Sequence, residues 1–355
     1  MIQGDKNVKK TLLAVSVAAC LAPASVMAAP AFYGKINLSL DKYSDYPDMN
    51  QQLNPGSLDD AWYVESNNSR LGLRGDEKVR NTDLTILYQL EAGYDVDGDS
   101  GQTFSTRNSY LGLGTNVGKF FAGRYDSVVK QAEGRIDQFN DTLADMDTLF
   151  LGQRRNSNTL NWESLDYSGL TFRAQLAPGE ETAVGTDTKD GLADTWGLSA
   201  TFEKDSLYAA LAYESSYATV NIPSTPVTSV GVDTDLIRAS AGLKLSDDVQ
   251  VGAIIERAEL DPNLAGADKA DSMSYLVSGR VGVSERVALK GQFGWLDSSD
   301  LDADVKVLTL GADYQLAEQA RAYALVSLSD TNFDDTTVDV DETGNAFSVG
   351  MVYSF

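Results

Sequence analysis

The chain ends on Phe347-Ser-Val-Gly-Met-Val-Tyr-Ser-Phe355, in which bulky apolar residues alternate with small ones. Because side chains of a strand point to opposite sides with period two, one face carries Phe347, Val349, Met351, Tyr353 and Phe355. A strand that ends the chain needs a partner for its backbone groups, and a closed barrel supplies one when the last strand pairs with the first. Lipid then covers the apolar face. The stretch therefore predicts an all-β fold, a transmembrane antiparallel β-barrel.

The terminal aromatic pattern, with Tyr353 and Phe355, resembles the assembly signal of Gram-negative outer-membrane barrels. The resemblance implies recognition by the barrel-assembly machinery. It also implies that the protein resides in the cell outer membrane.

The first 28 residues have the pattern of a secretory signal peptide. Lys6, Lys9 and Lys10 precede an apolar run from Leu12 to about Ala24. The run is shorter than the roughly 18 to 20 apolar residues of a spanning helix, and Val26-Met27-Ala28 fits a small-residue cleavage site. We expect cleavage after Ala28, which leaves residues 29–355 as the mature barrel. The alternative is lipidation at Cys20, since Val17-Ala-Ala-Cys20 also resembles a lipoprotein cleavage site.

The composition excludes several classes of function. The chain has no histidine and one cysteine, Cys20, which the predicted cleavage removes. Histidine-based and thiolate catalysis, histidine-ligated metals and disulfides are then ruled out, so we expect neither an enzyme nor a cofactor. The net charge of −24 argues against nucleic acid as a partner. It fits a surface where divalent cations bridge carboxylates to anionic lipid, here lipopolysaccharide.

From Phe32 onward, segments of about ten residues with alternating polarity are separated by connections that are alternately long and short. In Ala31–Leu40, the outer face carries Ile36, Leu38 and Leu40, and the inner face carries Lys35, Asn37 and Ser39. Leu84–Tyr94 and Val305–Tyr314 show the same division. The outer surface is therefore expected to be apolar and the inner one polar.

The connections give the expected number of strands. Seven short turns are predicted near residues 76–81, 115–118, 164–168, 203–205, 246–248, 284–285 and 317–319. Eight long polar loops are predicted near residues 42–60, 95–103, 126–152, 179–194, 215–234, 260–272, 297–303 and 330–344. These connections join sixteen strands, with 14 or 18 as the alternatives. Sixteen strands leave an aqueous channel, whereas eight would be filled by side chains.

Tryptophan placement supports two interfacial girdles. Trp62, Trp196 and Trp295 fall at the loop ends of strands, while Trp162 and Tyr167 flank a short turn. The alternative is that some of these rings only pack against neighbouring loops.

Three segments together resemble the trimeric general porins of Gram-negative bacteria: Ser69-Arg-Leu-Gly-Leu-Arg-Gly75, Gly118-Lys-Phe-Phe-Ala-Gly-Arg124, and Arg155-Asn-Ser-Asn-Thr-Leu-Asn-Trp162 with Tyr167-Ser-Gly169. With the leader and Phe355, the resemblance covers essentially the whole mature chain. It implies a homotrimer of 16-stranded barrels. Each barrel would be a water-filled pore for passive diffusion of ions and small hydrophilic solutes, narrowed by a third loop folded inward.

The segment 126–152 is the longest predicted connection and is too long for a simple hairpin. It carries carboxylates among apolar residues such as Phe139, Leu143, Met146 and Leu149. Folding into the lumen would let the apolar residues anchor on the wall while carboxylates face the passage. The alternative is an acidic surface loop in solvent.

Strand alternation predicts the charges of the constriction. Arg70 and Arg74 lie opposite Leu71 and Leu73, so lipid on the leucines places both arginines in the lumen. Leu160 and Trp162 likewise turn Arg155 inward, with Ser157, Thr159 and Asn161. The adjacent phenylalanines do not settle the parity of Arg124, and its match to the family motif favours the lumen. The expected pore constriction comprises Arg70, Arg74, Arg124, Arg155, Asp126, Asp137 and Asp141. Opposed charges there would impose a transverse field on solutes, or could simply pair for stability.

Asp95-Val-Asp-Gly-Asp-Ser-Gly101 has carboxylates at alternate positions, as a calcium loop does. Ser100 stands where the loop needs glycine, and Thr106 stands where it needs a bidentate glutamate. We therefore predict no defined metal site, and only loose divalent binding at the acidic residues of 334–342.

Two function classes remain beside the general diffusion pore: a substrate-specific channel, for example for an anion such as phosphate, and a barrel enzyme. The acidic net charge and the third-loop carboxylates favour weak to moderate cation preference at low salt. Asp137 and Asp141 would set this preference, opposed by Arg70, Arg74 and Arg155.

Overall fold

The computed structural model describes residues 30–48, 56–58, 60–98, 101–184, 187–222, 228–263, 266–335 and 338–355. The predicted signal peptide, residues 1–28, and parts of several loops lie outside these ranges, so the predicted cleavage site is not described. None of the helices in the described ranges is long and apolar enough to span a membrane.

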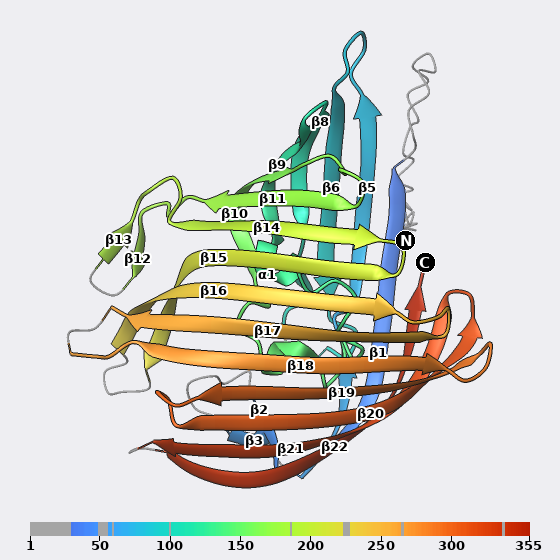
Figure 1. Cartoon of the computed structure of the whole chain (residues 1–355), viewed down its shortest axis with the longest axis vertical. Helices are drawn as coiled ribbons and strands as arrows, with labels where there is room; N and C mark the ends of the chain where they lie inside the picture. Colours follow the sequence, from blue (N-terminus) through green and yellow to red (C-terminus); the bar gives the residue numbers. More distant parts are fainter. Residues whose placement is uncertain are drawn as a thin grey trace, which may run out of the picture.

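The described residues form a closed antiparallel barrel of sixteen strands (Figure 1). The first half of the wall comprises β1 (Ala31–Ser44), β4 (Trp62–Ser66) continuing into β5 (Arg70–Lys78), β6 (Thr85–Tyr94), β7 (Phe104–Thr106) continuing into β8 (Ser109–Thr115), β9 (Gly118–Asp126), β10 (Arg155–Glu163), β11 (Leu170–Ala177) and β14 (Thr195–Lys204). The second half comprises β15 (Leu207–Ile222), β16 (Thr228–Lys244), β17 (Val249–Pro262), β18 (Ala270–Gly282), β19 (Val287–Ser298), β20 (Ala303–Ala317), β21 (Ala320–Asp335) and β22 (Val338–Ser354).

The first and last strands close the barrel. β1 pairs with β22 from Lys35↔Ser354 to Ser44↔Asn345, and on its other edge with β4 and β5. The last residue takes part, because the Gly34 amide donates to the Phe355 carbonyl at 2.9 Å and the Phe355 amide donates to the Gly34 carbonyl at 3.0 Å. No edge strand is left in the described barrel to expose unpaired backbone to lipid.

Alternation along the strands separates lipid from lumen as expected. On β22 the apolar side chains are 39–55% exposed on the outer face: Phe347, Val349, Met351, Tyr353 and Phe355. Ala346, Ser348 and Val352 between them are buried. The outward aromatic side chains pair near the strand ends, with ring centroids 5.1 Å apart for Trp196 and Tyr213 and 5.2 Å apart for Tyr275 and Trp295.

All seven short turns occur, and the first lies about three residues later than predicted, between β5 and β6. Two long loops were placed wrongly. The expected loop 215–234 is largely strand, since β15 and β16 pair as far as Ile222↔Thr228, and the expected loop 330–344 is strand up to Asp335↔Val338. The hairpin ladder continues outside the bilayer, where both faces are polar, so alternation no longer marks the strand.

Two other loops carry small hairpins of their own. β2 (Tyr46–Asp48) pairs with β3 (Gly56–Leu58) in the first loop, and β12 (Thr182–Val184) pairs with β13 (Asp187–Lys189) in the fourth. The third loop takes a different course. Figure 1 shows its helix α1 (Val128–Gln131) behind the wall strands β15 and β16 rather than beyond their ends.

We expect Phe355→Ala to reduce the yield of folded barrel. The Phe355 ring lies 6.1 Å from Phe32 and 6.0 Å from Tyr353, measured between centroids, and losing these aromatic contacts costs about 1 kcal/mol at the seam. The folded fraction is measured as heat-modifiable protein in outer-membrane fractions. Phe347→Ala is the matched control, because Phe347 is equally exposed on the same strand but lies away from the end. Equal yields from the two variants would contradict a role of Phe355 in assembly.

Candidate functional site: the constriction of the barrel

The third loop, between β9 and β10, folds into the barrel. It contains α1, capped by Ser127, whose hydroxyl oxygen accepts from the Lys130 amide at 3.0 Å. It also contains the 3₁₀ turn η2 (Met146–Thr148), capped by the carboxylate of Asp145. The predicted bounds, 126–152, are within two residues of those observed.

Apolar residues of the loop pack against the inner face of the wall in three places. Val128, Val129 and Ala132 contact β15–β17 through Ala210, Ala212, Leu236 and Ala258. Ile136, Met146, Leu149 and Phe150 contact Ile254, Leu276, Val305 and Val307. Phe139 and Ala144 contact Tyr323, Leu325 and Val352. Because these side chains are buried against the wall, the loop narrows the lumen along one side and leaves the opposite side open.

An ion pair inside the barrel holds both ends of the loop. Arg238 on β16 and Glu256 on β17 are 0% and 1% exposed, and the Arg238 Nε donates to Glu256 Oε2 at 2.8 Å. Arg238 Nη1 donates to the Val129 carbonyl at 3.1 Å, and the Gly152 amide donates to Glu256 Oε1 at 3.0 Å. One pair of charges therefore joins the start of the loop, its end and two wall strands.

Two of the loop carboxylates stabilise the loop itself. Asp137 accepts from the amides of Phe139 at 2.8 Å and Met146 at 3.0 Å. Asp145 accepts from the amides of Asp141 at 2.7 Å and Asp147 at 3.0 Å. Burial raises the pKa of Asp137 to about 6, and burial with the neighbouring Asp137 and Asp147 carboxylates raises the pKa of Asp145 well above its usual range. The carboxylate oxygens of Asp137 and Asp145 are therefore largely occupied by backbone amides of the loop.

A cavity of about 610 Å³ lies between the loop and the wall strands β1, β5 and β17–β21, several of which also carry packing contacts of the loop. We call it the constriction cavity. Seven cationic side chains line it: Lys35, Arg70, Lys130, Arg135, Arg280, Lys290 and Arg321. Five acidic side chains line it: Asp126, Glu133, Asp137, Asp141 and Asp313. Most of the cations project from the wall and most of the acids from the loop side.

Two carboxylates are each shared between two wall cations. Asp141, at the tip of the loop, pairs with Lys35 and lies 3.2 Å from Arg70 Nη1. Although burial acts to raise it, these two cations hold the pKa of Asp141 below its usual value. Asp313 on β20 lies 3.0 Å from Lys290 Nζ and 2.9 Å from Arg321 Nη1. Each of the two clusters retains a net positive charge.

Three further cations of the cavity have no such partner. Within the described part of the chain, the side chains of Lys130, Arg135 and Arg280 make no hydrogen bond or ion pair. The acid Glu133 accepts from the side-chain amides of Asn140 at 3.2 Å and Gln153 at 3.0 Å, and burial raises its pKa to about 7. Near neutral pH the cavity therefore carries more positive than negative charge.

Of the arginines expected in the constriction, Arg70 lines the cavity, while Arg74 and Arg155 lie outside its lining. Arg70 reaches Asp141 in the cavity. Arg74 lies four residues further along β5, where it pairs with Ala31, and its guanidinium group lies over the Tyr33 ring, 5.0 Å from the centroid. Arg155 lies beside the cavity, with its Nη2 3.0 Å from Asp126.

Arg124, which was expected in the constriction from the family motif, does not line the constriction cavity. Phe120 is 46% exposed on the lipid side, and the register between β9 and β10 shifts between Asn156 and Thr159. At this bulge Arg124 bonds the hydroxyl of Ser157, and Arg124 is not among the residues that line the constriction cavity. The extra residue of this bulge belongs to β10, where Ser157 and Asn158 stand opposite the single residue Arg124, so the bulge shifts the parity of β10 and not that of β9.

Sequence reasoning missed four charged wall residues of the cavity, which are Arg280, Lys290, Asp313 and Arg321, and it assigned Lys35 to the inner face without including it in the constriction. A signal was present for some of them. Lys290 follows the exposed Leu289, and Asp313 precedes the exposed Tyr314, so alternation alone turns both inward. Their convergence on the third loop depends on barrel register, which no local pattern contains.

No group of three or more His, Cys, Asp or Glu side chains in the described ranges is arranged to hold a metal ion. In the calcium-like segment, Asp95 accepts from the Gly98 amide at 3.3 Å, and Asp97 accepts from the Ser66 amide at 2.5 Å. Residues 99 and 100 of that segment lie outside the described ranges.

A closed sixteen-stranded barrel with an apolar outer belt, and a polar lumen narrowed by an inward loop, defines an outer-membrane diffusion channel. The chain belongs to the Gram-negative porin family, whose model matches residues 14–336. It is 25% identical over 337 residues to the major outer membrane protein P.IB of Neisseria meningitidis serogroup B, covering 90% of this chain and 92% of that protein.

Solved structures show the same fold. An anion-selective porin from Comamonas acidovorans superposes with a TM-score of 0.70 and 16% identity, covering 92% of this chain and 99% of that chain. The trimer form of OmpT, an outer membrane protein of Vibrio cholerae, superposes with a TM-score of 0.69 and 18% identity over the same shares of the two chains. The protein is thus a porin of the cell outer membrane.

We expect Glu256→Leu to loosen the third loop. The substitution leaves Arg238 buried without its carboxylate, which costs about 3–5 kcal/mol. The readouts are the variance of the open-channel current at fixed voltage, which should rise, and the urea concentration of half-unfolding, which should fall.

The double variant Arg238→Met with Glu256→Leu is the control, because replacing a whole buried pair by apolar groups is close to neutral. It should recover most of the lost stability and part of the current stability. A single variant indistinguishable from the parent in both readouts would show that the pair does not anchor the loop.

Proposed function

We propose that this porin is a continuously open, non-enzymatic pore for ions and small hydrophilic solutes, and that its constriction favours small anions. The observation that carries the anion preference is the charge of the constriction cavity. Seven cationic side chains face five acidic ones there, and both Asp141 and Asp313 are shared between two cations. Such a pore is one form of the anion-preferring channel that the sequence left as an alternative.

The charges nearest the narrowest passage dominate permeation. Screening limits the reach of a solvent-exposed charge to about 8 Å at physiological ionic strength. The excess of acidic residues over the whole chain therefore acts mainly at the mouths, while the wall cations act on each ion that passes. Unpartnered cations, here Lys130, Arg135 and Arg280, attract anions most directly.

This sign is opposite to the preference predicted from the sequence. That prediction treated Asp137 and Asp141 as free carboxylates. Asp137 is instead occupied by backbone amides, and Asp141 by Lys35 and Arg70. The sequence-based prediction also lacked the cations on β18, β19 and β21.

The remaining parts of the proposal concern assembly and export. We propose export by a signal peptide cleaved after Ala28, insertion by the barrel-assembly machinery, and contact with lipopolysaccharide, aided by divalent cations at acidic loop residues. A homotrimer is supported by the resemblance to trimeric porins. Insertion of conductance in steps of three units in planar bilayers would test the trimer, and absence of conductance would refute the pore.

We expect Arg280→Gln to shift the reversal potential in a KCl gradient toward cations. One unit charge at about 5 Å in water changes the local concentration of chloride by a factor of about two to four and that of potassium by the same factor in the opposite direction, so the ratio of the two permeabilities changes by a factor of about four to sixteen. Asp341→Asn is the control, because Asp341 is exposed in the β21–β22 hairpin, far along the strand from the constriction. A larger shift from Asp341→Asn than from Arg280→Gln would mean that the mouth, not the constriction, sets the selectivity.

The anion preference should increase as the pH falls from 8 to 6. Burial raises the pKa of Glu133 to about 7, so its carboxylate is largely charged at pH 8 and largely neutral at pH 6, and acidification removes negative charge from the cavity. Reversal potentials at pH 8, 7 and 6 measure the effect. Glu133→Gln should flatten this dependence and hold the selectivity near the parental value at pH 6. An unchanged slope in the variant would assign the titration to another group.

A further inference from the structure

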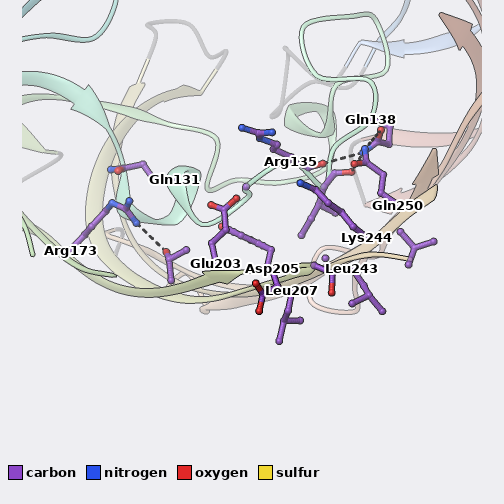
Figure 2. A pocket seen from close by; sticks show the side chains of 17 residues that line it. Gln131, Arg135, Gln138, Arg173, Glu203, Asp205, Leu207, Leu243, Lys244 and Gln250 are labelled. Carbon is purple, nitrogen blue, oxygen red and sulfur yellow. Dashed lines mark hydrogen bonds between the residues drawn. The ribbon is translucent and has the colours of Figure 1, made fainter. Parts of the chain in front are cut away.

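A second cavity, of about 260 Å³, adjoins the constriction cavity and shares with it the lining residues Gln131, Gly134, Arg135, Gln138 and Gln250 (Figure 2). Residues 131–138 of the loop form one side, and the ends of β14–β17 at the β14–β15 turn form the other. Since this turn is one of the short connections, the cavity lies on the periplasmic side of the constriction. It is large enough for an amino acid or a dipeptide and smaller than the pockets that hold drug-sized ligands.

The floor of the cavity is apolar and rigid. The Tyr208 ring packs against Gly134, where a Cβ atom would lie 2.5 Å from the ring, and the Tyr208 hydroxyl donates to the Ala132 carbonyl at 3.0 Å. Ile136 lies over Gly242 and Gly252 of the wall. These contacts fix the loop at the back of the cavity and leave a flat surface beside Gly242.

The rim carries charges of both signs that are not paired with each other. In the described ranges the side chains of Arg135, Lys244 and Glu203 make no ion pair or hydrogen bond. Figure 2 shows the ends of Glu203 and Lys244 directed into the space below Arg135. The amide of Gln250 donates to Gln138 Oε1 at 3.0 Å, and Gln138 Nε2 donates to the Arg135 carbonyl at 3.0 Å, so the backbone that carries Arg135 is held in place.

We propose that this cavity is a transient binding site for a small zwitterion with an apolar side group, such as a dipeptide. The carboxylate of the ligand meets Arg135 and Lys244, its ammonium group meets Glu203, and its side group lies on Tyr208 and Gly242. A simple anion would face the carboxylates of Glu203 and Asp205, and a simple cation would face Arg135 and Lys244, so a ligand that carries both charges matches the cavity better than either. Exposed ion pairs are weak, so binding delays passage without closing the pore.

The inference rests on the open pore proposed above, and the conductance in KCl reports that pore independently. The probe is the dipeptide phenylalanylalanine, added to single channels in planar bilayers, and the readout is the mean duration of current blockades. N-acetyl-phenylalanylalanine removes the ammonium charge, and phenylalanylalanine amide removes the carboxylate charge. The zwitterion should block about three to five times longer than either derivative, as expected for one exposed ion pair.

Variants locate the site. Glu203→Gln and Lys244→Gln should each shorten the zwitterion blockades about three- to fivefold. The matched controls are Asp247→Asn and Lys204→Gln, because both residues are exposed near the same end of the barrel and do not line the cavity; both should keep the parental duration. Gly242→Val fills the floor without changing charge, since its Cβ would make ordinary contacts with Ile136 at 3.5 Å and Tyr208 at 3.7 Å, and it should abolish the long blockades.

Only channels with measurable KCl conductance are scored, so a folding defect is not counted as loss of binding. Three results would overturn the proposal: no blockades by the zwitterion in conducting channels, equal durations for the zwitterion and its N-acetyl derivative, or equal effects of Lys204→Gln and Lys244→Gln. Loss of conductance in the parent would instead refute the proposed pore.

Discussion

Backbone hydrogen bonding in lipid is the constraint on which the rest of the structure depends. Every amide and carbonyl within the bilayer must be paired inside the protein, so the sheet has to close, and it closes through β1 and β22. Closure fixes the register of all the strands, and register decides which inner side chains lie at the same height. Lys290 and Arg321 converge on Asp313 because three consecutive strands are held in one register. The charge of the constriction therefore follows from closure of the sheet.

Loops are usually exposed and polar, but in the third loop the apolar side chains and several carboxylates are buried. Phe139 and Met146 pack on the wall, and the buried Asp137 accepts from the backbone amides of the same two residues. An irregular segment in the lumen can satisfy its backbone in this way without a sheet or a long helix. Acidic residues in such a segment do not all act on permeating ions. Asp141, at the tip, pairs with cations of the wall, whereas the Asp145 carboxylate accepts hydrogen bonds from backbone amides of the loop.

The fold could be predicted because its signals are local. Each of these signals lies within a segment of one or two strands. They are the alternation in Ala31–Leu40 and Phe347–Phe355, the positions of the turns and the length of the third loop. The ends of β15, β16, β21 and β22 could not be predicted, since polarity stops alternating once the hairpins leave the bilayer. The site was only partly predictable: Asp141 pairs with Lys35, 106 residues away, and no local pattern encodes that contact. Arg124 was assigned to the constriction from the family motif alone, and in the structure it bonds Ser157 at a bulge of β10 and does not line the constriction cavity.

Surface charge and channel charge have different origins in this porin. Acidic residues in the extracellular hairpins raise solubility and repel one another in water at little cost, so they accumulate there and dominate the net charge of −24. Inside the barrel the buried carboxylates, such as Asp137, Asp141 and Asp313, are paired or hydrogen-bonded, because the lumen wall and the third loop exclude part of the solvent. Where one carboxylate is shared by two cations, as at Asp141 and Asp313, its negative charge is balanced and one positive charge remains. A chain that is strongly acidic as a whole can thus present a positive field at its narrowest point.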